Sequence, residues 1–167
     1  GYALAADTDV TLKDVADYCD VFYIGGTKVG ALCGEAVVFT KENVPAHFLT
    51  RIKQQGGLLA KGRLLGIQFL TLFEENRYFD ISAHAARLAE KLKDELTKMG
   101  VKFYINSPTN QQFPILPDAV LAELKKKYSF AYQERMDETH SAVRFCTCWA
   151  TKEENVEALL TDIRAII

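Results

Sequence analysis

The sequence predicts an α/β fold, because short apolar runs typical of strands alternate with longer segments of helical periodicity. The clearest strand pattern covers residues 21–24 and is broken by Gly25 and Gly26, and the clearest helical pattern covers residues 80–99. Of the 167 residues, 49% are apolar and 25% are charged. The chain can therefore bury a sizeable core, and it is neither disordered nor fibrous.

A first helix is predicted to begin at Thr11, a favourable N-cap residue, and Asp14 suits its first turn. Its inward face has the spacing i, i+3, i+4 and i+7 and consists of Leu12, Val15, Ala16 and Cys19. The strand over residues 21–24 is predicted to be buried, and a second strand over residues 34–39 follows the glycine turn.

Two helical patterns follow this pair of strands. The first begins near residue 44 and is interrupted by residues 54–57. The second covers residues 58–73 and is apolar on most faces, which predicts a helix buried on nearly all sides.

The segment over residues 80–99 predicts a helix with one solvated face, and Gly100 marks its end. Its narrow apolar stripe consists of Leu88, Leu92, Leu96 and Met99. The rest of the chain predicts two strands, a short helix, two strands and a last helix with a capping box of Thr151 and Glu154. The strands cover residues 101–105, 112–116, 130–134 and 142–149, and the short helix covers residues 118–127. This β-β-α-β-β-α order predicts a small α/β domain.

The charge pattern indicates no nucleic-acid-binding face, because 20 basic and 22 acidic residues are interspersed and give a net charge of −2. The basic cluster over residues 125–127 is interpreted as a solvated helix end. No apolar run approaches the roughly 20 residues that span a bilayer, and the first residues lack the pattern of a signal peptide. We therefore expect a cytoplasmic protein with no nucleic-acid partner and no membrane.

The cysteines and histidines predict no metal site. Cys19, Cys33, Cys146 and Cys148 lie in apolar stretches without a Cys-x-x-Cys pair, and we interpret them as small buried hydrophobic residues. The three histidines are isolated along the sequence from the cysteines and from one another, so ligands at metal-binding spacing are missing.

Lys28 is the main candidate for chemistry, because it follows a predicted buried strand within a glycine-rich turn. Open α/β sheets place functional groups at strand ends, and a lysine in a water-poor pocket acts as a nucleophilic amine. The alternative is a solvated loop lysine beside a hairpin. A nucleotide-phosphate loop is rejected, because the segment lacks the first glycine and the Gly-Lys-Ser/Thr order of that motif.

Arg144 is the second candidate. It lies in a predicted strand between Val143 and Phe145, and a guanidinium in such apolar company is costly unless it faces a carboxylate or a phosphate. Its neighbours in the strand alternation, Ala142 and Cys146, are small. The alternatives are an arginine that pairs with an internal glutamate and one that points to solvent from an edge strand.

Three segments resemble one family of enzymes. YCDVFYIGGTK over residues 18–28, GGLLAKGR over residues 56–63 and VRFCTCWA over residues 143–150 are similar to segments of the low-specificity threonine aldolases. These are fold-type I lyases that depend on pyridoxal phosphate, and the resemblance covers the C-terminal half of such an enzyme. It implies the C-terminal portion of the large cofactor-binding domain over residues 1–79 and a small C-terminal α/β domain over residues 80–167.

The resemblance also implies roles for individual residues. Lys28 forms an imine with the cofactor aldehyde, and Thr27 is a turn former that can also donate to the cofactor phosphate. Lys61 and Arg63 help to bind this phosphate across a dimer interface, although many family members have Met-Arg-Gln where this chain has Leu-Ala-Lys. The alternative for these two cations is a solvated loop. Arg144 binds the α-carboxylate of the amino-acid substrate.

The function implied is cleavage of threonine or a similar β-hydroxy amino acid to glycine and an aldehyde, by a homodimer or homotetramer when the enzyme is complete. The alternatives are β-elimination on a related amino acid and a non-catalytic α/β interaction module. The family's ring-stacking histidine, and the aspartate that pairs with the pyridine nitrogen, belong to the first half of such enzymes. We therefore expect this chain to be an incomplete fragment that is inactive alone.

Overall fold

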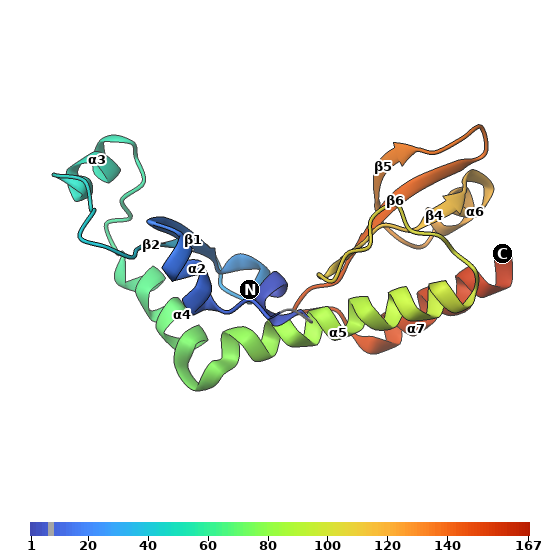
Figure 1. Ribbon diagram of the computed structural model, residues 1–167, viewed down its shortest axis with the longest axis horizontal. Coiled ribbons are helices and arrows are strands. Elements are labelled where there is room, and N and C mark those ends of the chain that lie inside the picture. Colours follow the sequence, from blue (N-terminus) through green and yellow to red (C-terminus); the bar gives the residue numbers. More distant parts are fainter. Residues whose placement is uncertain (7–8) are drawn as a thin grey trace. The chain divides into compact units, whose positions relative to one another are not determined.

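The computed structural model describes residues 1–6 and 9–167, which form two compact units (Figure 1). Unit 1 comprises Gly1 and residues 9–80, and unit 2 comprises the described residues 2–6 and 81–167. The division falls inside one long helix, α5 (Arg77–Lys98), whose first turn belongs to unit 1. Each unit combines helices with antiparallel strands, and the predicted α/β class is confirmed.

The strand pair of unit 1 is a two-stranded antiparallel sheet with Tyr23 opposite Val37. The elements of this unit before α5 are α2 (Leu12–Tyr18), β1 (Val21–Gly25), the 3₁₀ turn η1 (Thr27–Val29), β2 (Glu35–Phe39), α3 (Phe48–Gln54), α4 (Arg63–Phe73) and the 3₁₀ turn η2 (Glu74–Asn76). α2 begins as predicted, because the Thr11 hydroxyl accepts from the backbone N–H of Asp14 while the Asp14 carboxylate accepts from the N–H of Thr11.

Two elements of unit 1 differ from the prediction. The strand over residues 21–24 alternates between exposed and half-buried side chains, and is not fully buried. The helix predicted over residues 58–73 begins only at Arg63, because residues 60–62 form a turn. It also exposes much of its apolar surface. Burial of an apolar helix depends on what packs against each face, and unit 1 provides neighbours for one face only.

The sheet of unit 2 is built around one central strand. The elements of this unit besides α5 are α1 (Tyr2–Ala5), β3 (Gln111–Gln112), β4 (Ile115–Pro117), α6 (Asp118–Leu124), β5 (Ala131–Arg135), β6 (His140–Cys146) and α7 (Glu153–Ile166). β6 pairs antiparallel with β5 along one side and with β3 and β4 along the other. From β3 to α7 the elements again follow a β-β-α-β-β-α order, but β3 and β4 together replace the single strand predicted over residues 112–116.

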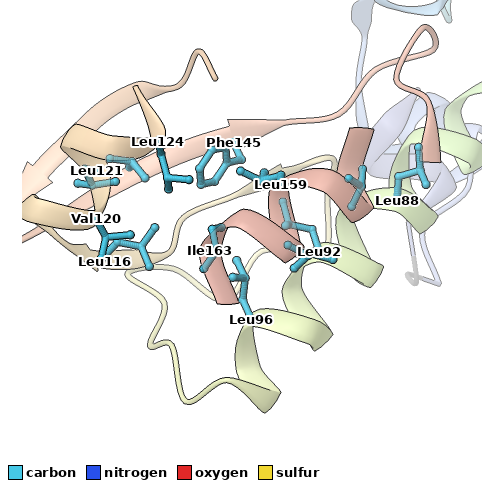
Figure 2. Close-up of a cluster of buried hydrophobic side chains, with 13 residues drawn as sticks. Leu88, Leu92, Leu96, Leu116, Val120, Leu121, Leu124, Phe145, Leu159 and Ile163 are labelled. Atoms are coloured by element: carbon cyan, nitrogen blue, oxygen red, sulfur yellow. The ribbon is translucent and has the colours of Figure 1, made fainter. Parts of the chain in front are cut away.

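The core of unit 2 lies between α5, α6, α7 and one face of β6 (Figure 2). The predicted stripe of α5 is confirmed, since Leu88, Leu92 and Leu96 are at most 5% exposed. They belong to one cluster with Ile163 of α7 and Phe145 of β6. Burying each such side chain stabilises the fold by about 1.5–3 kcal/mol, so this core holds β6 in a fixed position.

Two local predictions for unit 2 are wrong. Residues 101–105 form no strand, because within this segment only Phe103 makes an isolated β-bridge. The last helix has Lys152 as its N-cap, without a side-chain hydrogen bond. The Thr151 hydroxyl, predicted to cap this helix, instead accepts from the N–H of Cys148 at 2.9 Å.

The prediction that all four cysteines are buried is also wrong. Cys33 and Cys146 are exposed, and Cys19 and Cys148 are half-buried. Cys33 lies in the loop before β2, and the alternation of β6 turns Cys146 away from the core. Among the described residues, no group of three or more His, Cys, Asp and Glu side chains is arranged to hold a metal ion. No helix in the described part of the chain has the length and apolarity needed to cross a membrane.

Candidate functional site

A tight turn between β1 and β2 carries Lys28. β1 ends at Gly25, and η1 then places Lys28 just beyond the strand, where the sequence predicts it. The Gly26 carbonyl accepts from the N–H of Val29 at 3.1 Å, and the buried Val29 side chain anchors the turn. Gly30 closes η1 with a φ of 100°, a conformation that favours glycine. The turn therefore has a defined backbone.

α4 supports this turn within unit 1. A Cβ atom at Gly26 would lie 3.1 Å from the Phe69 ring and 2.8 Å from the Ala31 Cβ, so the close approach requires glycine. The Gln68 side-chain oxygen accepts from the backbone N–H of Leu32 at 2.6 Å. The face of α4 that unit 1 covers is therefore the face that holds the lysine turn.

Tyr78, in the first turn of α5, gives the turn a second support. Its hydroxyl donates to the Gly25 carbonyl oxygen at 2.9 Å. The Tyr78 ring is 3% exposed and stacks on Phe73, with ring centroids 5.0 Å apart. Burial raises the pKa of Tyr78, so its hydroxyl remains a donor at neutral pH.

The side chains of Thr27 and Lys28 are exposed, which contradicts the expectation of a water-poor pocket around the amine. The reason is the small size of the sheet. It has only two strands within the described residues, and β1 is half-buried at most, so the turn between the strands is less covered than a turn at the end of a fully buried strand. Lys28 has the predicted place in the fold, and the cofactor-binding roles of both residues stay predictions.

Lys61 and Arg63 lie at the start of α4. Arg63 is its first residue, and Lys61 belongs to the turn before it, so both cations are near a helix N-terminus. Both side chains are exposed, and neither forms an ion pair within the described residues. The same helix holds the Lys28 turn through Gln68 and Phe69. A contact of these cations with a phosphate stays a prediction.

Arg144 lies on the central strand of unit 2, on the face opposite the core. Its sequence neighbours Val143 and Phe145 belong to the core cluster, so strand alternation puts Arg144 on the other face with Ala142 and Cys146. The alternative of an edge-strand arginine is wrong, because β6 is paired on both sides.

The guanidinium of Arg144 has an unsatisfied donor. Its Nε is buried and has no hydrogen-bond partner among residues 1–6 and 9–167. No ion pair to Arg144 occurs in the described part of the chain, so the structure does not show the alternative of an internal glutamate partner. A buried donor without an acceptor costs about 1–3 kcal/mol. The site therefore favours an acceptor of another molecule or segment, such as a carboxylate.

Small and apolar residues flank Arg144 on this face of the sheet. Ala131 of β5 pairs with it on one side, and the register of β3 and β4 with β6 puts Phe113 opposite it on the other. A carboxylate of the same sheet, that of Glu134, accepts from the Tyr104 hydroxyl and raises the pKa of Tyr104. The Glu134 carboxylate therefore binds Tyr104 and is not the acceptor for the Arg144 guanidinium.

The candidate residues are divided between the two units. Those of unit 1 are Thr27, Lys28, Lys61 and Arg63, and that of unit 2 is Arg144. Sequence reasoning did not identify Gln68 and Tyr78, which hold the lysine turn. The available signals were a polar side chain in an otherwise apolar helix and a tyrosine at a helix start, since buried tyrosine hydroxyls usually have a partner.

The sequence is similar to curated enzymes over most of its length. Low-specificity L-threonine aldolases of Pseudomonas sp. (strain NCIMB 10558) and Pseudomonas aeruginosa are 31% and 28% identical to it over 153 residues. Each match covers 89% of this chain and 42% of the relative, so the chain spans less than half the length of these relatives. No protein-family model matches the chain.

Solved structures agree with this similarity. A threonine aldolase of Leishmania major matches with a TM-score of 0.94 and 36% identity, over 99% of this chain and 48% of that one. An archaeal O-phosphoseryl-tRNA(Sec) selenium transferase and a serine palmitoyltransferase of Sphingomonas wittichii match with TM-scores of 0.62 and 0.63, at 16% and 15% identity, and show the fold alone. The chain is thus similar, over almost its whole length, to about half of a threonine aldolase, and its structure matches a little under half of the fold of the fold-type I pyridoxal-phosphate enzymes.

Proposed function

We propose that the chain provides one half, the C-terminal half, of a pyridoxal-phosphate-dependent threonine aldolase. In this proposal, Lys28 is the amine that holds the cofactor, and Arg144 binds the substrate carboxylate. The observation that carries it is the buried Nε of Arg144, which has no partner in the described part of the chain and lies on a strand whose other face is core. An arginine held in this way is suited to a bidentate contact with a carboxylate.

The residues of unit 1 fit the cofactor. Lys28 offers a primary amine on a turn of defined backbone, and Thr27 beside it offers a hydroxyl donor. Lys61 and Arg63 offer exposed cations at the start of the helix that supports this turn, which suits a phosphate group. When bound, pyridoxal phosphate supplies an electron sink for cleavage of a bond to the substrate α-carbon.

The chain's own groups then have separate tasks. The Arg144 guanidinium binds the substrate carboxylate, and the packing of Val143 and Phe145 in the core fixes the strand from which it projects. The turn that carries Lys28 is held by the hydrogen bonds to the Gly25 and Gly26 carbonyls, and the Lys28 amine, in its unprotonated form, would act as the nucleophile toward the cofactor. Lys61 and Arg63 would neutralise the phosphate, and Thr27 would donate a hydrogen bond that orients it.

The same proposal includes the rest of the assembled enzyme. Its substrate is threonine or a similar β-hydroxy amino acid, its products are glycine and an aldehyde, and it is a cytoplasmic homodimer or homotetramer. The 167-residue chain alone is inactive. Support for the substrate and the products is the similarity to threonine aldolases, which are more than twice as long as the matched segment.

A chimaera tests the proposal. The matched half of the Leishmania major threonine aldolase is replaced by this chain, and the purified protein is given pyridoxal phosphate and L-threonine. We expect glycine and acetaldehyde as products, and we expect Lys28→Ala to abolish them. Lys53→Ala, which changes an exposed lysine of α3 in the same unit, serves as the matched control and leaves the activity intact.

Two other outcomes contradict the proposal. Ammonia and a keto acid in place of glycine indicate a β-eliminating lyase. A folded chimaera with no product indicates a non-catalytic interaction module, provided that the parent Leishmania enzyme is active in the same assay.

A further inference from the structure

Buried polar side chains gather where the loop over residues 107–112 meets the end of β6. Six serine, threonine, asparagine and glutamine residues are buried within residues 1–6 and 9–167, and four of them lie at this place: Ser107, Asn110, Gln112 and Thr147. Buried polar groups are costly unless they are paired, and a paired network holds its segments in one arrangement. The end of β6 therefore has a source of rigidity besides the apolar core.

Thr147, the residue after β6, is hydrogen-bonded through its N–H, its carbonyl and its hydroxyl. The N–H donates to the Asn110 carbonyl oxygen at 3.0 Å, and the carbonyl oxygen accepts from the Asn110 side-chain amide at 2.7 Å. The hydroxyl donates to the Ala85 carbonyl oxygen of α5 at 2.7 Å. We call these bonds the Thr147 anchor. They connect the end of β6 both to a loop and to a helix of the same unit.

Gln112 fixes the loop that carries Asn110. Its side-chain amide donates to the carbonyl oxygens of Ser107 and Thr109, at 3.2 and 2.9 Å. Gln112 is 1% exposed and lies in β3, directly opposite Phe145 of β6. The loop is thus attached to the same strand that the Thr147 anchor holds, so Asn110 is itself a fixed partner.

The sheet gives β6 limited support next to Arg144. Pairing of β6 with β5 ends at the pair of Arg144 with Ala131, and within the described residues β5 has no partner further along β6. On the other side, the pairing is interrupted between β3 and β4, where Pro114 accepts from the Val143 N–H but has no N–H to donate. The position of Arg144 therefore depends on what holds the strand beyond it.

We infer that Asn110 and Thr147 are positioning residues for Arg144, an inference that rests on the proposed role of Arg144 in binding the substrate carboxylate. Thr147 is three residues beyond Arg144, and its hydroxyl bonds α5 on the core side of the strand, whereas Arg144 lies on the opposite face. Thr147 thus acts through the strand and not by contact with a ligand. The anchor prevents a shift of the strand end, and such a shift would misplace the guanidinium for a two-pronged contact.

Paired titrations test the inference. The chimaera of this chain with the unmatched half of the Leishmania enzyme is loaded with pyridoxal phosphate and titrated with glycine and with methylamine, which is glycine without its carboxylate. Thr147→Val removes the hydroxyl at nearly constant side-chain volume. We expect it to weaken glycine binding at least fivefold and to leave methylamine binding unchanged, because only glycine uses the carboxylate contact. A variant that merely lowers the folded fraction changes both affinities alike.

Three further variants complete the experiment. Thr147→Ser keeps the hydroxyl and should restore the affinity for glycine. Asn110→Ala removes the side-chain bond to Thr147 and should act in the same direction as Thr147→Val, which keeps the test decisive if one of the two variants does not fold. Thr161→Val is the matched control and should change neither affinity, because the Thr161 hydroxyl donates to the Glu157 carbonyl oxygen at 2.8 Å at an exposed position of α7.

Hydrogen exchange of the cofactor-free chimaera measures the anchor without any ligand. In Asn110→Ala, the amide of Thr147 should exchange at least fivefold faster than in the wild type, because its partner is no longer fixed by the side-chain bond. The amide of Tyr128, which donates to the Leu124 carbonyl oxygen at 2.8 Å, should exchange at an unchanged rate. Equal rates at Thr147 in both proteins would show that Asn110 does not hold the strand end.

Two results of the titrations overturn the inference while the proposed function stands. One is glycine binding by the wild-type chimaera that neither Thr147→Val nor Asn110→Ala weakens. The other is an equal weakening of glycine and methylamine binding by these variants. A wild-type chimaera that binds glycine no more tightly than methylamine contradicts the proposed role of Arg144 and overturns the inference with it. The wild-type titration thus distinguishes the two failures.

Discussion

The Tyr78 hydroxyl donates a hydrogen bond of 2.9 Å to the carbonyl oxygen of Gly25, the residue that ends β1. These residues are 53 positions apart in the sequence. The bond connects the start of a long helix to the turn that presents Lys28. The position of the candidate nucleophile thus depends on a contact that no local sequence pattern encodes.

Tyr78→Phe should loosen this turn. The change removes one hydrogen bond and leaves the ring packing intact, so the local opening free energy should fall by about 0.5–1.5 kcal/mol. Hydrogen exchange at the amide of Val29, which is bonded to the Gly26 carbonyl, measures this effect. Tyr23→Phe, at a ring that is 70% exposed, is the matched control and should leave the rate unchanged. Equal rates in all three proteins would show that the Tyr78 bond does not hold the turn.

Arg144→Lys should weaken binding of glycine to the active chimaera. Lysine keeps the charge but loses the two-pronged contact, so the binding free energy should become less favourable by about 1.5–3 kcal/mol. Calorimetric titration with glycine measures the change. Arg135→Lys is the control, because Arg135 of β5 in the same sheet forms a partly exposed ion pair with Asp118 of α6, and its replacement should have little effect. Unchanged affinity in Arg144→Lys would rule out the carboxylate role.

Leu96→Ala should strongly destabilise unit 2. Leu96 is fully buried in the cluster between α5 and its neighbours, and truncation of such a leucine costs about 2–5 kcal/mol. Urea unfolding followed through Trp149, the only tryptophan, reports on this unit. Ile105→Ala, at an exposed side chain, should change the midpoint little. A similar small effect in both variants would contradict the assigned core.

Asp137 should make the β5–β6 turn sensitive to acid. Its carboxylate accepts from the backbone N–H groups of Thr139 and His140, chiefly the former, and these bonds lower its pKa from 3.8 to about 2. A lowered folded-state pKa means that the contribution to stability is complete above pH 3.8 and is lost as the pH falls toward 2. NMR titration of the carboxyl carbon should give a midpoint near 2. Asp137→Ala should lose this pH dependence, and a wild-type midpoint near 3.8 would contradict the assignment.

Elements stabilised within a few residues were predictable from the sequence. The capping box of Thr11 and Asp14 is a contact over three residues, and the stripe of Leu88, Leu92 and Leu96 reflects one helical period. Thr151 offered the same type of local signal, but its hydroxyl is used by the Cys148 amide. In such loops, the backbone N–H groups of the helix and of the preceding turn compete for the same hydroxyl, and the local sequence does not decide which of them binds it.

Burial was less predictable, because it depends on contacts between distant segments. Ile67 and Leu70 indicated a fully buried helix, yet unit 1 covers only the opposite side of α4. The positions of Lys28 after a strand and of Arg144 within one were predictable from alternation and glycine breaks. The unsatisfied Nε of Arg144 and the support from Tyr78 required the three-dimensional arrangement.

The most direct test of the account is to identify the lysine that binds the cofactor. The chimaera of this chain with the unmatched half of the Leishmania enzyme is loaded with pyridoxal phosphate, reduced with borohydride and digested, and the labelled peptide is sequenced by mass spectrometry. The account predicts a phosphopyridoxyl group on Lys28, at the end of β1, and its loss in Lys28→Ala. A label on Lys61 or on any other lysine of the folded protein would contradict it.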